Sequence, residues 1–174
     1  IIVVISLYLL IYWGTHIIPV DHWGLAISIN FIFMTYFTIN YGILFKPDYS
    51  SKYFSISSFE KESPLYKWLG LKLYVKLLRI TGWEKLARKD HPIKKNLELL
   101  KAYDFESRGS EIIHLLSAIC VSILCLWIWG AFSLWHTRWI IFINILVNVY
   151  PVVLQRYNRI RVTRVIKALE VRRH

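Results

Sequence analysis

The sequence predicts an all-α integral membrane protein with four transmembrane helices and a helical, amphipathic insertion between the second and the third. Of the 174 residues, 56% are hydrophobic, above the roughly 45–50% apolar share of a typical soluble domain. Uncharged runs alternate with basic ones: 14 of the 22 Lys and Arg residues lie in residues 46–108, and 7 lie after position 155. This pattern excludes a water-soluble enzyme, a disordered tail and a DNA-binding domain of ordinary type.

Four stretches are apolar enough to cross the membrane, which takes roughly 20 residues of helix. The first is followed by Pro19, and the second carries no charge. The third contains one ionisable residue, His114, near its start, and the fourth is uncharged but short. The expected spans are residues 1–18, 23–45, 112–132 and 139–155. Together with the insertion they form one membrane domain over residues 1–174.

The basic residues predict the orientation of these spans. The short connection 15–22 has no Lys or Arg, and the connection 130–138 has one. Because Lys and Arg are enriched in cytoplasmic loops, the insertion 46–108 and the tail 156–174 are expected to face the cytoplasm. We therefore expect a multi-pass protein of the plasma (inner) membrane with both termini cytoplasmic.

The insertion contains a predicted helix over residues 65–79, which follows Ser63 and Pro64. Pro is favoured in the first turn of a helix. Basic and apolar residues fall on two faces: Lys72, Lys76 and Arg79 on one, and Leu71, Tyr74, Val75 and Leu78 on the other. Such a helix is expected to lie among the lipid headgroups, either as an anchor on anionic lipid or at an entrance for a lipid substrate.

The candidates for chemistry lie at the inner edges of the last two spans. Glu111 and His114 are three positions apart and so share a helical face, and an ionisable residue just inside a bilayer usually faces protein or water. The end of the fourth span carries amide, phenol and guanidinium groups: Asn148, Gln155, Arg156, Tyr157, Asn158, Arg159 and Arg161. Because the two spans are antiparallel, His114 and Gln155 are expected at the same depth.

The pair of Glu111 and His114 has three interpretations: a general base oriented by a carboxylate, a structural pair, and part of a metal site. Metal is the least favoured, because di-metal bundles need a second Glu-x-x-His motif and further carboxylates. The arginines Arg156, Arg159 and Arg161 either bind phosphate through their forked guanidiniums or anchor the inner membrane edge. Cysteines without CxxC spacing suggest neither zinc nor a disulfide framework.

Residues 106–114 (Glu-Ser-Arg-Gly-Ser-Glu-Ile-Ile-His) and 155–161 (Gln-Arg-Tyr-Asn-Arg-Ile-Arg), with Asn148 and Pro151, resemble the glycosyl-4,4′-diaponeurosporenoate acyltransferase family. Its members carry out the last acylation in staphyloxanthin-type carotenoid synthesis. The likeness covers roughly residues 53–170 and includes upstream positions: Phe59, Glu60, Lys61, Tyr66, Gly70 and Lys76. Two positions depart from the family pattern, because Lys61 stands where glycine is usual and Val75 where an aromatic is usual.

The resemblance implies an acyltransferase that moves a fatty acyl group from a thioester to a hydroxyl of a membrane glycolipid or glycosylated carotenoid. The donor would be acyl-CoA or acyl carrier protein, with no metal or redox cofactor. His114 would act as general base, Glu111 would orient it, and Gln155 or Asn148 would stabilise the oxyanion. The remaining candidates for substrate binding are Glu60, Glu106, Arg156, Tyr157, Asn158, Arg159 and Arg161.

The expected partners are membrane lipid, a lipid-like acceptor and other membrane proteins, with no nucleic acid. Two alternatives remain open at this point. The chain could be a non-catalytic small subunit or assembly factor of a larger membrane complex. It could also be a metal-dependent membrane enzyme that uses Glu111 and His114.

Overall fold

The computed structural model describes residues 12, 19, 21–44, 52–57, 59–60, 65–83, 96–131 and 133–172, and within these ranges it contains helices and no strand. The chain divides into two compact units, drawn from Ile1–Lys46 with Ile113–Val149 and from Pro47–Ile112 with Tyr150–His174. The division passes through one long helix, α7 (Leu97–Ala131), and follows a π-helical turn, η2 (Ile145–Val149).

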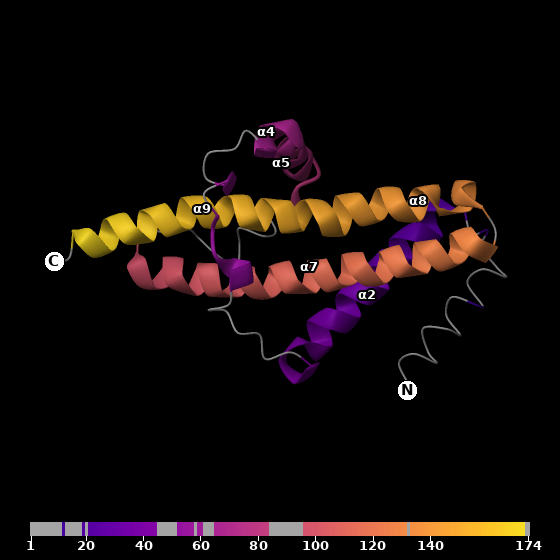
Figure 1. The fold of residues 1–174 in the computed structure, drawn as a ribbon, viewed down its shortest axis with the longest axis horizontal. Helices are drawn as coiled ribbons and strands as arrows, with labels where there is room; N and C mark the ends of the chain where they lie inside the picture. Colours follow the sequence, from indigo (N-terminus) through magenta and orange to yellow (C-terminus); the bar gives the residue numbers. More distant parts are fainter. Residues whose placement is uncertain are drawn as a thin grey trace. The chain divides into compact units, whose positions relative to one another are not determined.

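The first unit consists of α2 (Trp23–Leu44), the second part of α7, α8 (Leu134–Asn144) and η2. In this unit α2 packs against α8 (Figure 1). Its buried core is apolar: Leu25, Ala26, Ile29, Val121, Cys125, Ile128 and Ile140. Large apolar side chains elsewhere on these helices remain exposed, among them Ile39, Ile43, Ile123 and Trp127. A helix that is apolar on all sides is typical of a membrane span.

The second unit consists of η1 (Lys52–Phe54), α4 (Leu65–Trp68), α5 (Leu71–Ile80), the first part of α7, and α9 (Tyr150–Val171). Figure 1 shows α4 and α5 beside α9, and residues of α5 and α9 are in contact. Four residues form the buried core of this unit: Tyr66, Leu71, Tyr74 and Ile160. Aromatic residues therefore hold the insertion against the last helix.

Three described helices are long and apolar enough to cross a membrane: Trp23–Ile43, Leu97–Gly130 and Leu134–Val171. They overlap the second, third and fourth predicted spans, so the prediction of an all-helical chain with helices able to span a membrane is confirmed for the described residues. The first predicted span, residues 1–18, lies outside the described residues apart from Tyr12, and the prediction of four spans stays a prediction.

The helix that contains the third span begins well before the predicted boundary at residue 112. Asn96 accepts a hydrogen bond from the backbone N–H of Glu98 through Oδ1 at 2.9 Å, so it caps the start of α7. The acidic side chain of Glu98 also suits the positive end of the helix dipole. Polar helix formers then continue into the apolar span, and the end of the predicted insertion is therefore helical.

The predicted helix over residues 65–79 is two helices in the structure. Gly70 separates α4 from α5 with φ of 65°, in the left-handed region that glycine adopts without steric cost. The hydroxyl of Tyr150 donates a hydrogen bond to the carbonyl oxygen of Leu69 at 3.0 Å. The break therefore turns the chain and gives α9 a free backbone acceptor to bind.

The two short connections that the charge pattern places outside are joined by an ion pair. Arg138 is the only Lys or Arg outside the two basic regions, and its Nη2 lies 3.4 Å from Oδ2 of Asp21. Its guanidinium also lies 4.1 Å from the centre of the Trp135 ring. In the structure Arg138 lies in the first turns of α8, so the ion pair joins the residues just before α2 to the start of α8 within the first unit.

This arrangement gives a direct test of orientation in a variant lacking Cys120 and Cys125. A thiol introduced at Ser133 is expected to react with an impermeant maleimide from outside intact cells, because its connection is almost free of basic residues. A thiol at Lys167, in the basic tail, is expected to react only after the membrane is opened. The reverse pattern of labelling would overturn the orientation.

Candidate functional site

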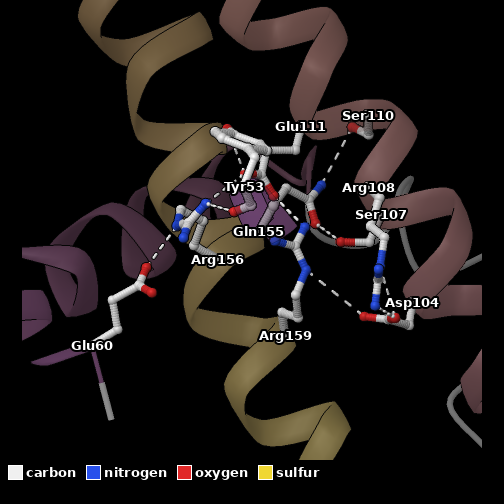
Figure 2. Close-up of polar contacts among 10 residues, drawn as sticks. All are labelled: Tyr53, Glu60, Asp104, Ser107, Arg108, Ser110, Glu111, Gln155, Arg156 and Arg159. Carbon is white, nitrogen blue, oxygen red and sulfur yellow. Dashed lines mark hydrogen bonds and ion pairs between the residues drawn. The ribbon is translucent and has the colours of Figure 1, made fainter. Parts of the chain in front are cut away.

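A network of charged side chains lies between α7 and α9 of the second unit (Figure 2). It contains three carboxylates, three guanidiniums and a phenol, and we call it the Arg–Glu network. Its members are Tyr53, Glu60, Asp104, Arg108, Glu111, Arg156 and Arg159. Because three negative charges face three positive ones, the network is balanced in charge.

Glu111 is the centre of the Arg–Glu network. Its side chain is fully buried, and its Oε2 accepts a hydrogen bond from Nη2 of Arg159, which is itself only 3% exposed. Its Oε1 accepts hydrogen bonds from the Tyr53 hydroxyl at 2.7 Å and from Nη1 of Arg156 at 3.3 Å. A buried charge is costly unless it is paired and hydrogen-bonded, and these three donors meet that condition for Glu111.

Arg156 links Glu111 to the insertion. Its Nε donates to Oε1 of Glu60 at 2.7 Å, and its Nη1 donates to the backbone carbonyl of Tyr53 at 3.1 Å. The side chain of Arg156 keeps 23% of its surface exposed, compared with 2% for Arg159. An incoming anion can therefore approach Arg156, as it can Arg108, whose side chain is 24% exposed, whereas Arg159 is enclosed.

Two pKa shifts describe the charge states at the edge of the network. The hydrogen bond from Arg156 lowers the pKa of Glu60 from its usual 4.5 to about 2, so the carboxylate is ionised at neutral pH. Burial, followed by the hydrogen bond to Glu111, raises the pKa of Tyr53 to about 12. The Tyr53 hydroxyl therefore keeps its proton and acts as a donor.

The other end of the network is formed by Asp104 and Arg108, one turn apart on α7. Arg108 donates to Oδ2 of Asp104 from Nε at 3.0 Å and from Nη2 at 2.6 Å. The guanidiniums of Arg108 and Arg159 lie 5.5 and 5.2 Å from the centre of the buried Phe54 ring. Phe54 therefore offers an aromatic face to two arginines, a favourable cation–π arrangement.

Gln155 joins the same two helices next to the network. Its Oε1 accepts a hydrogen bond from the Ser107 hydroxyl at 2.7 Å, and its Nε2 donates to Oγ of Ser110 at 3.3 Å. The second hydrogen of this amide has no described acceptor, so Gln155 keeps a donor for a further oxygen.

His114 lies in the first unit, on the part of α7 that follows Glu111. Its imidazole interacts with the Val147 backbone and with the Asn148 side chain. Pro151 lacks the N–H that would bond the Val147 carbonyl in a regular helix, which explains why this carbonyl has room for another donor. The Nδ1 atom of His114 is buried and has no hydrogen-bond partner among the described residues.

Asn148 belongs to a chain of buried amides within the first unit. Its Nδ2 donates to Oδ1 of Asn30 at 2.8 Å and to Oδ1 of Asn144 at 2.9 Å. Asn144 in turn donates to the Ala118 carbonyl at 3.2 Å and to the Ser122 hydroxyl at 3.3 Å. Both amide hydrogens of Asn148 are therefore used, whereas one amide hydrogen of Gln155 has no described acceptor.

The remaining predicted residues are less involved in the network. Arg161 is exposed, and its guanidinium lies 5.9 Å from the centre of the Tyr157 ring, which in turn packs against Tyr66. Asn158 interacts with the Tyr103 side chain. Glu106 is exposed on α7. The prediction that these residues bind substrate stays a prediction.

Sequence reasoning missed several members of these clusters. Asp104 could have been found from its position four residues before Arg108, a spacing that favours an ion pair on a helix. Asn30 and Asn144 could have been noticed as polar residues within otherwise apolar, uncharged runs. Tyr53 could not have been found from the sequence, because its partner Glu111 lies 58 positions away.

The low pKa of Glu60 has a measurable consequence for stability. Because the folded-state pKa of about 2 is below the usual 4.5, the pair with Arg156 stabilises the fold fully above pH 4.5. This contribution is lost as the pH falls towards 2. The Glu60→Gln variant should therefore show a flatter dependence of melting temperature on pH than wild type in this window. An unchanged slope would contradict the Glu60–Arg156 pairing.

Long helices apolar on several sides, together with a buried and charge-balanced polar network beside basic segments, define a helical membrane protein with a candidate site at the polar ends of its spans. The model of the glycosyl-4,4′-diaponeurosporenoate acyltransferase family matches residues 50–168. The chain belongs to this family, which confirms the resemblance seen in the sequence. The match contains the whole Arg–Glu network, as well as His114, Gln155 and Arg161.

Family membership indicates an acyltransferase of carotenoid biosynthesis. Searches of the curated proteins and of the solved structures give no significant match. Among the described residues no group of three or more His, Cys, Asp or Glu side chains is arranged to hold a metal ion.

Proposed function

We propose that the protein transfers a fatty acyl group from a thioester donor to a hydroxyl of a glycosylated carotenoid or a similar glycolipid in the membrane. The observation that carries the proposal is the family match over residues 50–168, which encloses every candidate catalytic and binding side chain. The donor would be acyl-CoA or acyl carrier protein. The protein would lie in the plasma membrane with both basic regions in the cytoplasm, where such donors occur.

The proposed reaction has His114 as its general base. An imidazole that donates from Nε2 to the Val147 carbonyl keeps a lone pair on Nδ1, which has no partner among the described residues. The acceptor hydroxyl would give its proton to this nitrogen while its oxygen bonds to the thioester carbon. The C–S bond then breaks, and the proton passes to the leaving thiolate. An N–H of Gln155 would stabilise the oxyanion that forms between these steps.

The arginines differ in the role that we assign to them. Arg159 is buried against Glu111 and keeps the network folded. Arg156 is partly exposed, so a phosphate of the donor can replace Glu60 as its partner. Arg161 is exposed five residues after Arg156 on α9 and can contact the same carrier. Glu60, once released, could accept a hydrogen bond from a sugar hydroxyl of the acceptor.

The proposal is tested with the purified full chain in lipid nanodiscs. Labelled acyl-CoA and acyl carrier protein are supplied in turn with a glycosylated carotenoid, and the pigment is analysed by mass spectrometry. An increase in pigment mass by one acyl group is expected with at least one donor. Failure with both donors would reject the enzyme and favour a non-catalytic subunit of a larger complex.

A separate prediction concerns donor binding. Arg161→Gln should raise the donor KM about tenfold or more, because a hydrogen bond to a charged group contributes about 1.5–3 kcal/mol. The acceptor KM should not change. Arg172→Gln, which removes the same charge beyond the end of α9, is the matched control. Equal donor KM values for the two variants would show that Arg161 anchors the membrane edge and does not bind the donor.

A further inference from the structure

The helix α5 carries three parallel strips of side chains. Each strip follows the spacing of three and four residues that places side chains on one helical face. The first strip is Leu71, Tyr74 and Leu78; the second is Lys72, Lys76 and Arg79; the third is Leu73, Leu77 and Ile80. From the sequence, the first strip belongs with Val75 to the apolar face of a helix that is expected to lie among the lipid headgroups.

In the structure the first strip packs against protein. Leu71 and Tyr74 are buried in the core of the second unit with Ile160 of α9. The Tyr74 ring stacks on Tyr150, with ring centres 4.8 Å apart. This strip is therefore occupied by α9 and is not available to lipid.

The third strip is exposed in the part of the chain that the structure describes. Leu73 and Ile80 are 73% and 72% exposed. Two tryptophans lie at the ends of the same segment: Trp68 in α4, which is 84% exposed, and Trp83 after Gly82. The exposed basic strip with Lys72 and Lys76 runs directly beside the third strip. Apolar side chains next to lysines, with flanking tryptophans, match the boundary between headgroups and acyl chains.

The place where α5 binds α9 corresponds to this boundary. Tyr150, which contacts α5, comes directly after the uncharged residues 139–149, and the first charged residue of α9 is Arg156. In Figure 1 α5 is seen close to end-on while α9 runs across the view, so α5 lies across α9. A helix that crosses a membrane span at the end of its apolar run lies along the membrane surface.

We infer that the segment of α4 and α5 binds the bilayer surface, with Leu73, Leu77 and Ile80 among the acyl chains. Lys72 and Lys76 contact anionic phospholipid headgroups. The occupant of the exposed strip is the lipid of the membrane that the protein spans. Anionic headgroups complement the basic strip, and the tryptophans favour the interface over a dry protein contact. This inference does not depend on the acyltransferase proposal.

The test uses the full chain with Cys120 and Cys125 replaced by alanine. A single thiol at Leu73 or at Lys167 carries a polarity-sensitive fluorophore. The protein is reconstituted in vesicles of phosphatidylcholine with or without phosphatidylglycerol, and brominated acyl chains serve as quenchers. The label at position 73 should show blue-shifted emission and strong quenching. The label at position 167, an exposed site on α9, should show neither effect.

The lysines are tested in the same assay. Phosphatidylglycerol should increase the quenching at position 73, and Lys72→Gln with Lys76→Gln should abolish this increase without changing the quenching at the Lys167 site. Equal quenching at positions 73 and 167 in both kinds of vesicle would overturn the inference. Blue-shifted emission without quenching by lipid would also overturn it, because the strip would then be covered by protein.

Discussion

Replacing His114 by alanine is expected to reduce acyl transfer at least about a hundredfold, since a positioned general base contributes about 10²–10⁴-fold to the rate. The imidazole interacts with Val147 and Asn148 within the first unit, and its Nδ1 has no partner among the described residues. Loss of the base should lower kcat and leave the donor KM unchanged. The rates are measured with purified protein at saturating donor.

The control for this prediction is His22→Ala. His22 is exposed and its Nδ1 accepts a hydrogen bond from the Gly24 N–H at the start of α2, so its loss should leave acyl transfer near the wild-type rate. Retention of full activity by His114→Ala would end the general-base hypothesis. Disappearance of that variant from the membrane would favour the structural interpretation of His114. His114→Gln, which keeps a side-chain donor for the Val147 carbonyl, would then decide whether catalysis is lost in a folded protein.

Replacing Glu111 by glutamine is expected to destabilise the protein by about 3–5 kcal/mol, the usual cost of leaving a buried charge unpaired. The carboxylate of Glu111 is fully buried, and Arg159 beside it is 3% exposed. Without the carboxylate, the guanidinium of Arg159 loses its hydrogen-bonded partner and keeps only Asp104 at 3.8 Å. The measurement is unfolding in mild detergent followed by circular dichroism.

A double variant tests whether the loss of stability comes from the unpaired charge of Arg159. Glu111→Gln combined with Arg159→Met removes both buried charges, and such replacements are often neutral or stabilising. The double variant should therefore regain most of the stability that the single variant loses. If it is less stable than Glu111→Gln alone, the Glu111–Arg159 pair is not what holds α7 and α9 together. The role of Glu111 in orienting His114 stays a separate prediction, which the kcat of this double variant would test.

The helical membrane character of the chain could be predicted because it depends on properties of consecutive residues. A span needs a run of apolar side chains, and α2, α7 and the helical run from α8 to α9 all contain one. The start of the helix α7 at Leu97 was not predicted. The cap at Asn96 and the polar helix formers after it start α7 before the membrane, and hydropathy does not detect such a start.

The candidate site was predicted only in part. The residue types and the likeness to the family indicated Glu111, His114, Gln155 and the arginines. These residues stand in short motifs, so they can be recognised from neighbouring positions in the sequence. The partners of these residues were not visible. Tyr53 and Glu60 reach Glu111 and Arg156 from the insertion, over sequence separations of 58 and 96 positions.

The sequence by itself determined that the chain forms apolar helices with basic flanks, and that its polar residues gather at the ends of the last two spans. The periodicity of apolar residues and the distribution of charge depend only on residues that are close in the sequence. Only the tertiary structure decided which apolar strip of α5 is buried by α9, and which guanidinium of α9 is enclosed and which stays partly exposed. Burial depends on what packs against a surface. Arg159 is enclosed with Glu111 whereas Arg156, three positions earlier on the same helix, keeps part of its surface exposed.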